Sequence, residues 1–113
     1  MAKTYKIRAL VKRTDEEIGH VTAISDSLKN LQRTVDGYIE CVTIRHDPHV
    51  VVICNEEARL LHLPYNCTVK GRDQLGEFDC PFFGDIIAFG ADGDAFCDLP
   101  EEVTRQEWAS WLV

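Results

Sequence analysis

The chain has 113 residues, of which 45% are hydrophobic and 27% charged, as expected for one globular domain with an ordinary core. Its formal net charge of -7 opposes contact with phosphate backbones, so we expect no direct nucleic-acid binding. No stretch approaches the roughly 18 to 20 apolar residues that span a bilayer. The five cysteines are odd in number and form no Cys-x-x-Cys pair, which argues against disulfides and structural zinc. We therefore expect a single cytoplasmic domain over residues 1–113, with free thiols and no membrane contact.

The first third of the chain is expected to form a strand pair and one helix. Residues 5–11 alternate loosely and precede a charged turn, which predicts a first strand and a partner strand through Val21. A helix is predicted over residues 27–36, with Asp26 as its N-cap. Gly37 stands where a helix commonly ends in a left-handed residue.

The middle of the chain predicts a hairpin and a second helix. Residues 38–44 are β-prone, residues 46–49 have turn composition, and residues 50–54 form a continuous apolar run typical of a buried strand. We expect this antiparallel hairpin to lie near the centre of the sheet. Asn55 is a good N-cap, and it predicts a short helix that must end near Pro64.

The last third is predicted to hold a loop, two strands and a third helix. Residues 70–78 are polar with two glycines, and we expect a mobile loop there. Residues 85–89 and 95–97 predict strands on either side of a turn. Thr104 and Glu107 have the spacing of a capping box at the start of a C-terminal helix. Together the elements predict an α+β fold, a mixed, mainly antiparallel sheet of about five strands with about three helices packed on it.

Asn55-Glu56-Glu57 is the motif with the most chemical potential. Two carboxylates after a strand can bind a cation or act as acid and base. On a helix, however, adjacent glutamates point about 100° apart and converge poorly on one ligand. The positive end of the helix dipole also favours both charges there. We therefore interpret the motif as a helix start, and the functional alternative stays open.

The other chemistry-bearing residues have structural interpretations as well. Residues 92–94 form an Asp-Gly-Asp turn signal that lacks the longer pattern of a calcium loop. His46 and His49 flank a turn, and Cys54 ends an apolar strand in which burial opposes thiolate formation. No phosphate-binding glycine loop, serine-hydrolase elbow or zinc-protease motif occurs. We therefore predict no catalytic residue, no metal site and no cofactor.

Four short segments carry a resemblance that covers the chain from Lys6 to Leu99. They are Gly37-Tyr38-Ile39-Glu40, Ile53-Cys54-Asn55-Glu56-Glu57, Leu63-Pro64-x-Asn66 and Gly84-Asp85-Ile86-Ile87. In this order the chain resembles an uncharacterised family of small domains that is common in bacteriophages, plasmids and Gram-positive bacteria. The resemblance implies a phage or mobile-element setting and supplies no activity. Its matching polar positions are our candidate binding residues: Tyr38, Glu40, Asn55, Glu56, Glu57, Asn66 and Asp85.

The resulting hypothesis is a non-enzymatic accessory protein that works in the cytoplasm of a bacterial host. We expect it to bind a host or phage protein, or a small ligand, and to serve an anti-defence or host-takeover role. One alternative is a small ligand- or nucleotide-binding module, or an enzyme, that uses a carboxylate cluster. A second alternative is an acidic mimic of DNA. A homodimer also stays open.

Overall fold

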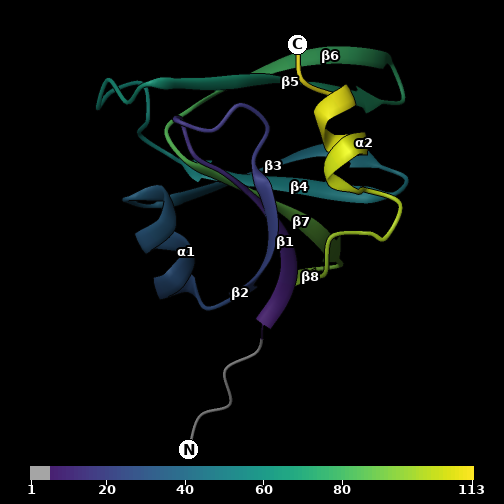
Figure 1. Ribbon diagram of the computed structural model, residues 1–113, viewed down its shortest axis with the longest axis horizontal. Coiled ribbons are helices and arrows are strands. Elements are labelled where there is room, and N and C mark those ends of the chain that lie inside the picture. Colours follow the sequence, from purple (N-terminus) through teal and green to yellow (C-terminus); the bar gives the residue numbers. More distant parts are fainter. Residues whose placement is uncertain (1–5) are drawn as a thin grey trace, which may run out of the picture.

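The computed structural model describes residues 6–113, and within them it contains eight strands and two short helices (Figure 1). Every strand pair is antiparallel. In chain order the elements are β1 (Lys6–Lys12), β2 (His20–Ser25), α1 (Leu28–Val35), β3 (Ile39–His46), β4 (His49–Asn55), β5 (Tyr65–Asp73), β6 (Gly76–Phe83), β7 (Ile86–Asp92), β8 (Ala95–Cys97) and α2 (Arg105–Ser110). The predicted α+β fold, with about five strands and about three helices, is therefore wrong, because the protein is mainly antiparallel β.

The main sheet has the strand order β2-β1-β7-β4-β3, and β8 pairs with the second half of β7. Strands β4 and β7 are nearly continuous apolar runs, and both are buried on both faces. The β3–β4 hairpin forms as predicted, but β3 is an edge strand and β7 holds the centre. The first strand is also confirmed, although Tyr5, where we predicted it to begin, lies outside the described residues.

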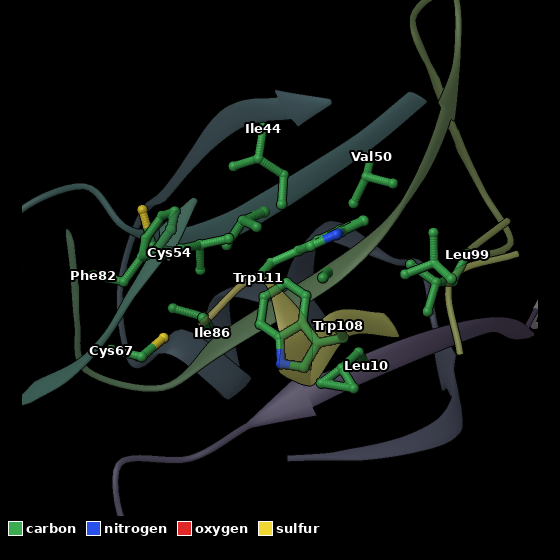
Figure 2. Close-up of a cluster of buried hydrophobic side chains, with 14 residues drawn as sticks. Leu10, Ile44, Val50, Cys54, Cys67, Phe82, Ile86, Leu99, Trp108 and Trp111 are labelled. Carbon is green, nitrogen blue, oxygen red and sulfur yellow. The ribbon is translucent and has the colours of Figure 1, made fainter. Parts of the chain in front are cut away.

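The sheet is the middle layer of the molecule, and each face has its own apolar cluster. Strands β5 and β6 form a separate two-stranded sheet that covers one face together with α2, while α1 covers the other (Figure 1). Figure 2 shows the larger cluster, in which Trp108 and Trp111 lie among side chains from the main sheet and from β5 and β6. Trp108 is fully buried, and its indole nitrogen donates to the Ile18 carbonyl at 2.9 Å.

Both helices begin with a capping side chain. Ser27, rather than Asp26, is the N-cap of α1, because its side chain accepts from the Asn30 amide at 3.2 Å. At the other end Asp36 takes the left-handed conformation that we assigned to Gly37. Thr104 caps α2 as predicted, and it accepts from the Glu107 amide at 3.1 Å.

Two predicted segments have a different structure. The helix expected after Asn55 is a series of turns, in which His62 has a left-handed φ of 54°. The mobile loop expected at residues 70–78 is the β5–β6 hairpin. Gly71 fits there because the Phe78 ring lies over it, so that an added Cβ would sit 2.3 Å from that ring. Neither helix within residues 6–113 is long and apolar enough to cross a membrane.

Candidate functional site

A cleft of about 380 Å³ lies where the first half of β3 and the end of β4 approach β6. We call it the acidic cleft, because carboxylates from β3 and from the turn after β4 line it. Four of the seven candidate residues lie there: Glu40 from β3, and Asn55, Glu56 and Glu57 from the end of β4 and the turn after it. The lining residues are Glu40, Val42, Cys54, Asn55, Glu56, Glu57, Ala58, Arg59, Leu60, Cys80, Pro81, Phe82 and Phe83.

Asn55 positions the acidic cleft through three hydrogen bonds. Its amide nitrogen donates to the carbonyls of Val35 and Asp36 at 3.1 and 3.0 Å, which satisfies the C-terminal end of α1. Its amide oxygen accepts from the Glu57 backbone at 2.7 Å. Only 3% of Asn55 is exposed, and an added Cβ at Gly37 would lie 2.6 Å from its amide nitrogen. Asn55 therefore joins α1 to the turn that carries the glutamates.

The three carboxylates of the acidic cleft are exposed and carry most of its charge. Glu40, Glu56 and Glu57 form no ion pair among residues 6–113. The Glu56 amide donates to the Tyr38 carbonyl at 2.8 Å, so the exposed Tyr38 lies beside the cleft. Arg59 supplies the opposite charge, with its guanidinium 5.3 Å from the centre of the Phe83 ring. The local charge is therefore negative and suits a cationic group.

The two thiols of the acidic cleft are poor nucleophiles. Burial raises the pKa of Cys54 to about 12, and the Glu40 carboxylate adds to this shift. Burial also raises the pKa of Cys80, again with a contribution from Glu40. Both groups are consequently neutral thiols at pH 7, whereas the thiolate is the reactive form. Within the described part of the chain, no group of three or more His, Cys, Asp or Glu side chains is placed to hold a metal ion.

Asn66 and Asp85 lie outside the acidic cleft and fasten the loop after β1. The Lys12 ammonium, which is 2% exposed, donates to the Asn66 side chain and to the Glu16 carbonyl, both at 2.7 Å. Asn66 returns hydrogen bonds to the carbonyls of Lys12 and Gly84 at 2.9 and 2.8 Å. Asp85 accepts from the Thr14 amide at 3.0 Å. We call Lys12, Asn66 and Asp85 the Lys12 clasp. Its hydrogen bonds join the loop after β1 to other parts of the same chain.

Sequence reasoning missed the wall of the acidic cleft that β6 supplies. Cys80 and Phe83 line that wall, and Arg59 comes from the turn that we predicted as a helix. Residues 70–78, which hold the end of β5 and the start of β6, looked like a loop because of their glycines and charges. The alternation of Phe78, Cys80 and Phe82 is the signal that could have revealed the strand.

The fold and the site define a class: a small antiparallel β domain with a negatively charged cleft beside one edge of its main sheet. The chain matches the family described as Domain of unknown function (DUF3846) over residues 7–111, and it belongs to this family. No curated protein and no solved structure matches it. The family match confirms the resemblance drawn from the sequence and adds no activity.

Proposed function

We propose that this domain acts by binding a protein partner through the acidic cleft and the apolar side chains at its rim. The observation that carries the proposal is the meeting of three unpaired carboxylates with exposed leucines on one surface. Glu40, Glu56 and Glu57 line the acidic cleft together with Leu60, which is 79% exposed. No ion pair within residues 6–113 neutralises the three charges.

The apolar rim consists of Leu60, Leu61 and Tyr65, each more than half exposed. Leu60 and Leu61 project from the turn after β4, and Tyr65 begins β5. The Tyr65 ring packs edge-on against Phe83, with ring centres 5.6 Å apart, and Phe83 lines the acidic cleft. Large apolar side chains grouped beside polar ones are typical of surfaces that contact other proteins. Leu60, and Tyr65 through its contact with Phe83, therefore connect the rim to the cleft.

The charges on this surface specify the chemistry of the partner. Three carboxylates face one guanidinium, so the acidic cleft attracts a lysine or arginine side chain. The apolar rim favours leucine, phenylalanine or a similar residue next to that basic group. The same charges repel nucleotide phosphates, which argues against the nucleotide-binding alternative at this cleft. We propose a partner segment in which a basic residue adjoins an apolar one.

The biological setting is part of the same proposal. The resemblance drawn from the sequence implies a bacteriophage or another mobile element. Small proteins of such elements often act by occupying a host protein, and a contact surface without an activated nucleophile suits that mode of action. We propose a host protein as the partner, with an anti-defence or host-takeover role for the complex.

Selection from a displayed random peptide library tests the partner chemistry. We expect the enriched peptides to combine lysine or arginine with a neighbouring large apolar residue. In the double variant Glu56→Gln/Glu57→Gln the same peptides should bind about tenfold more weakly, a change of about 1.4 kcal/mol. Because both side chains are exposed, the free energy of unfolding should change by about 0.5 kcal/mol or less.

The matched control is Glu101→Gln/Glu102→Gln, which neutralises another adjacent pair of exposed glutamates. It should bind the selected peptides like the unaltered protein. Equal weakening in both double variants would show only a general charge effect. Acidic or purely apolar peptides among the enriched peptides would contradict the proposed chemistry of the partner.

A further inference from the structure

A second cleft, of about 650 Å³, lies between the β3–β4 turn and the β5–β6 turn. It is at the other end of β3 from Glu40, and it contains two arginines. We call it the guanidinium cleft. Its lining residues are Arg45, His46, Asp47, Arg72, Asp73, Gln74 and Leu75.

A β-bulge directs Arg45 toward the face of the sheet that α2 covers. The register of β3 and β4 shifts between Thr43 and Arg45, so that Arg45 pairs with Val50. Val50 belongs to the larger apolar cluster, and the bulge turns the arginine toward that side. Its guanidinium lies 4.4 Å from the centre of the Trp111 ring, and one terminal nitrogen donates to the Lys70 carbonyl at 3.1 Å. Arg45 is thus held in one orientation before any ligand arrives.

The positive charge of Arg45 has no counterion of its own within residues 6–113. Its Nε is buried and has no hydrogen-bond partner among those residues. Glu77 already pairs with Arg72 at 3.5 Å, and Glu107 accepts from the Trp111 indole at 3.2 Å. Burial lowers the pKa of Arg45, and the charge of Arg72 lowers it further, against opposing effects of the two glutamates. A guanidinium has five N–H donors, and the Lys70 carbonyl occupies one of those of Arg45. Because Nε is buried, the terminal nitrogens are the donors that remain for a ligand.

Two aspartates also line the guanidinium cleft. The Asp73 carboxylate accepts from the Leu75 amide at 2.8 Å, which stabilises the β5–β6 turn. Asp47 and His46 are exposed in the β3–β4 turn. The carboxylates of Glu77 and Glu107 raise the pKa of Arg45 and so favour its charged form. Arg45 forms no ion pair with a carboxylate within residues 6–113, so an unpaired positive charge remains at this cleft although the whole chain is acidic.

We propose that the guanidinium cleft binds the phosphate group of a small organic phosphate. Arg45 offers one unpaired guanidinium, and Arg72 can supply a second if the phosphate displaces its exposed pairing with Glu77. The tetrahedral oxygens of a phosphate can accept from two such planar donor forks. The volume of the cleft falls within the roughly 300 to 1,000 Å³ typical of small-molecule sites, which leaves room for more than phosphate. Leu75, which is 97% exposed, offers an apolar surface for the remainder of the ligand. This site is separate from the acidic cleft and does not depend on the proposed protein partner.

Nitrogen-detected titration by NMR tests the proposal with three probes at constant ionic strength: inorganic phosphate, adenosine monophosphate and adenosine. Phosphate should replace chloride so that only the anion changes. We expect saturable shifts of the Arg45 Nε–H signal and of the backbone amides of residues 72–75 with either phosphate compound, and none with adenosine. Equal shifts with adenosine, or no saturable shift with either phosphate compound, would overturn the proposal.

Arg72→Gln and the control Arg33→Gln separate a site from general charge attraction. Both side chains are exposed and both variants lose one positive charge, but Arg33 lies on α1, which covers the opposite face of the sheet. Arg72→Gln should weaken phosphate binding about tenfold or more, and Arg33→Gln should leave it unchanged. Arg45→Gln should also abolish binding, and the exposed Arg72 decides the question if that variant folds poorly. Unaltered affinity in Arg72→Gln, or equal weakening in Arg33→Gln, would overturn the proposal.

Discussion

Replacing Asn55 with alanine is expected to lower the free energy of unfolding by about 3 kcal/mol. The substitution removes hydrogen bonds to the carbonyls of Val35 and Asp36 and from the Glu57 amide. All three partners lose a buried or partly buried bond, and each lost bond costs about 1 kcal/mol, with more where the partner stays unsatisfied. The missing side chain also leaves a gap opposite Gly37. Denaturant unfolding of Asn55→Ala and the unaltered protein measures the loss.

Asn55→Asp is the control of equal shape. It keeps an oxygen that can accept from the Glu57 amide, but it points a second oxygen at the two carbonyls that close α1. We expect it to be at least as destabilised as Asn55→Ala at neutral pH, because both variants lack the donor and the carboxylate oxygen also repels the two carbonyl oxygens. A loss of only about 1 kcal/mol in Asn55→Ala, the usual value for a simple N-cap, would contradict the connecting role.

Replacing Asn66 with alanine is expected to cost about 3 kcal/mol as well, for a different physical reason. The Lys12 ammonium is 2% exposed and relies on Asn66 and the Glu16 carbonyl for its hydrogen bonds. Without the Asn66 side chain, a buried cation loses one of its two acceptors. The carbonyls of Lys12 and Gly84 lose their donor at the same time. Thermal or denaturant unfolding gives the size of the effect.

Asn66→Asp distinguishes the charge of Lys12 from the other two contacts. Its carboxylate can still accept from the Lys12 ammonium, while the donors to the two carbonyls are lost. We expect a smaller loss of stability than in Asn66→Ala, because the buried cation keeps its partner. If both variants were as stable as the unaltered protein, the Lys12 clasp would have no structural importance, and Asn66 would return as a candidate for binding.

Local patterns in the sequence predict much of the fold. The strand β1, the hairpin β3–β4, the strands β7 and β8, and both helices follow from alternation, turns and caps. A partner strand for β1 was also expected, but β2 begins at His20, close to Val21 where we expected that strand to end. Asn55 accepts from the Glu57 amide as an N-cap would, but the residues after it form separate turns, with His62 left-handed, and no continuous helix follows. The bonds from Asn55 to α1 are tertiary contacts that no local pattern shows. The β5–β6 hairpin was not predicted, because Gly71 in the middle of the segment indicated a loop. In the structure Gly71 pairs with Phe78 on the neighbouring strand, and the Phe78 ring lies over it.

The two clefts differ in how far the sequence could predict them. Glu40, Glu56 and Glu57 stand out as polar residues at strand ends, and the fold brings them to one cleft. Arg45 could not be assigned, because its orientation depends on a bulge that shifts the β3–β4 register. The buried position of Lys12 could have been inferred in part, since strand alternation places it on the same face as the buried Leu10.

Photo-cross-linking from the apolar rim tests most directly whether the acidic cleft and this rim bind a protein. A photoreactive amino acid at position 60, where Leu60 is 79% exposed, should capture a discrete partner in bacterial host cells. The same amino acid at position 28 is the control, because Leu28 is 58% exposed on α1, which covers the other face of the main sheet. We expect the position-60 product to disappear in the Glu56→Gln/Glu57→Gln background and to be absent from position 28. Identical products from both positions, or a position-60 product that persists without the two carboxylates, would contradict binding through the acidic cleft.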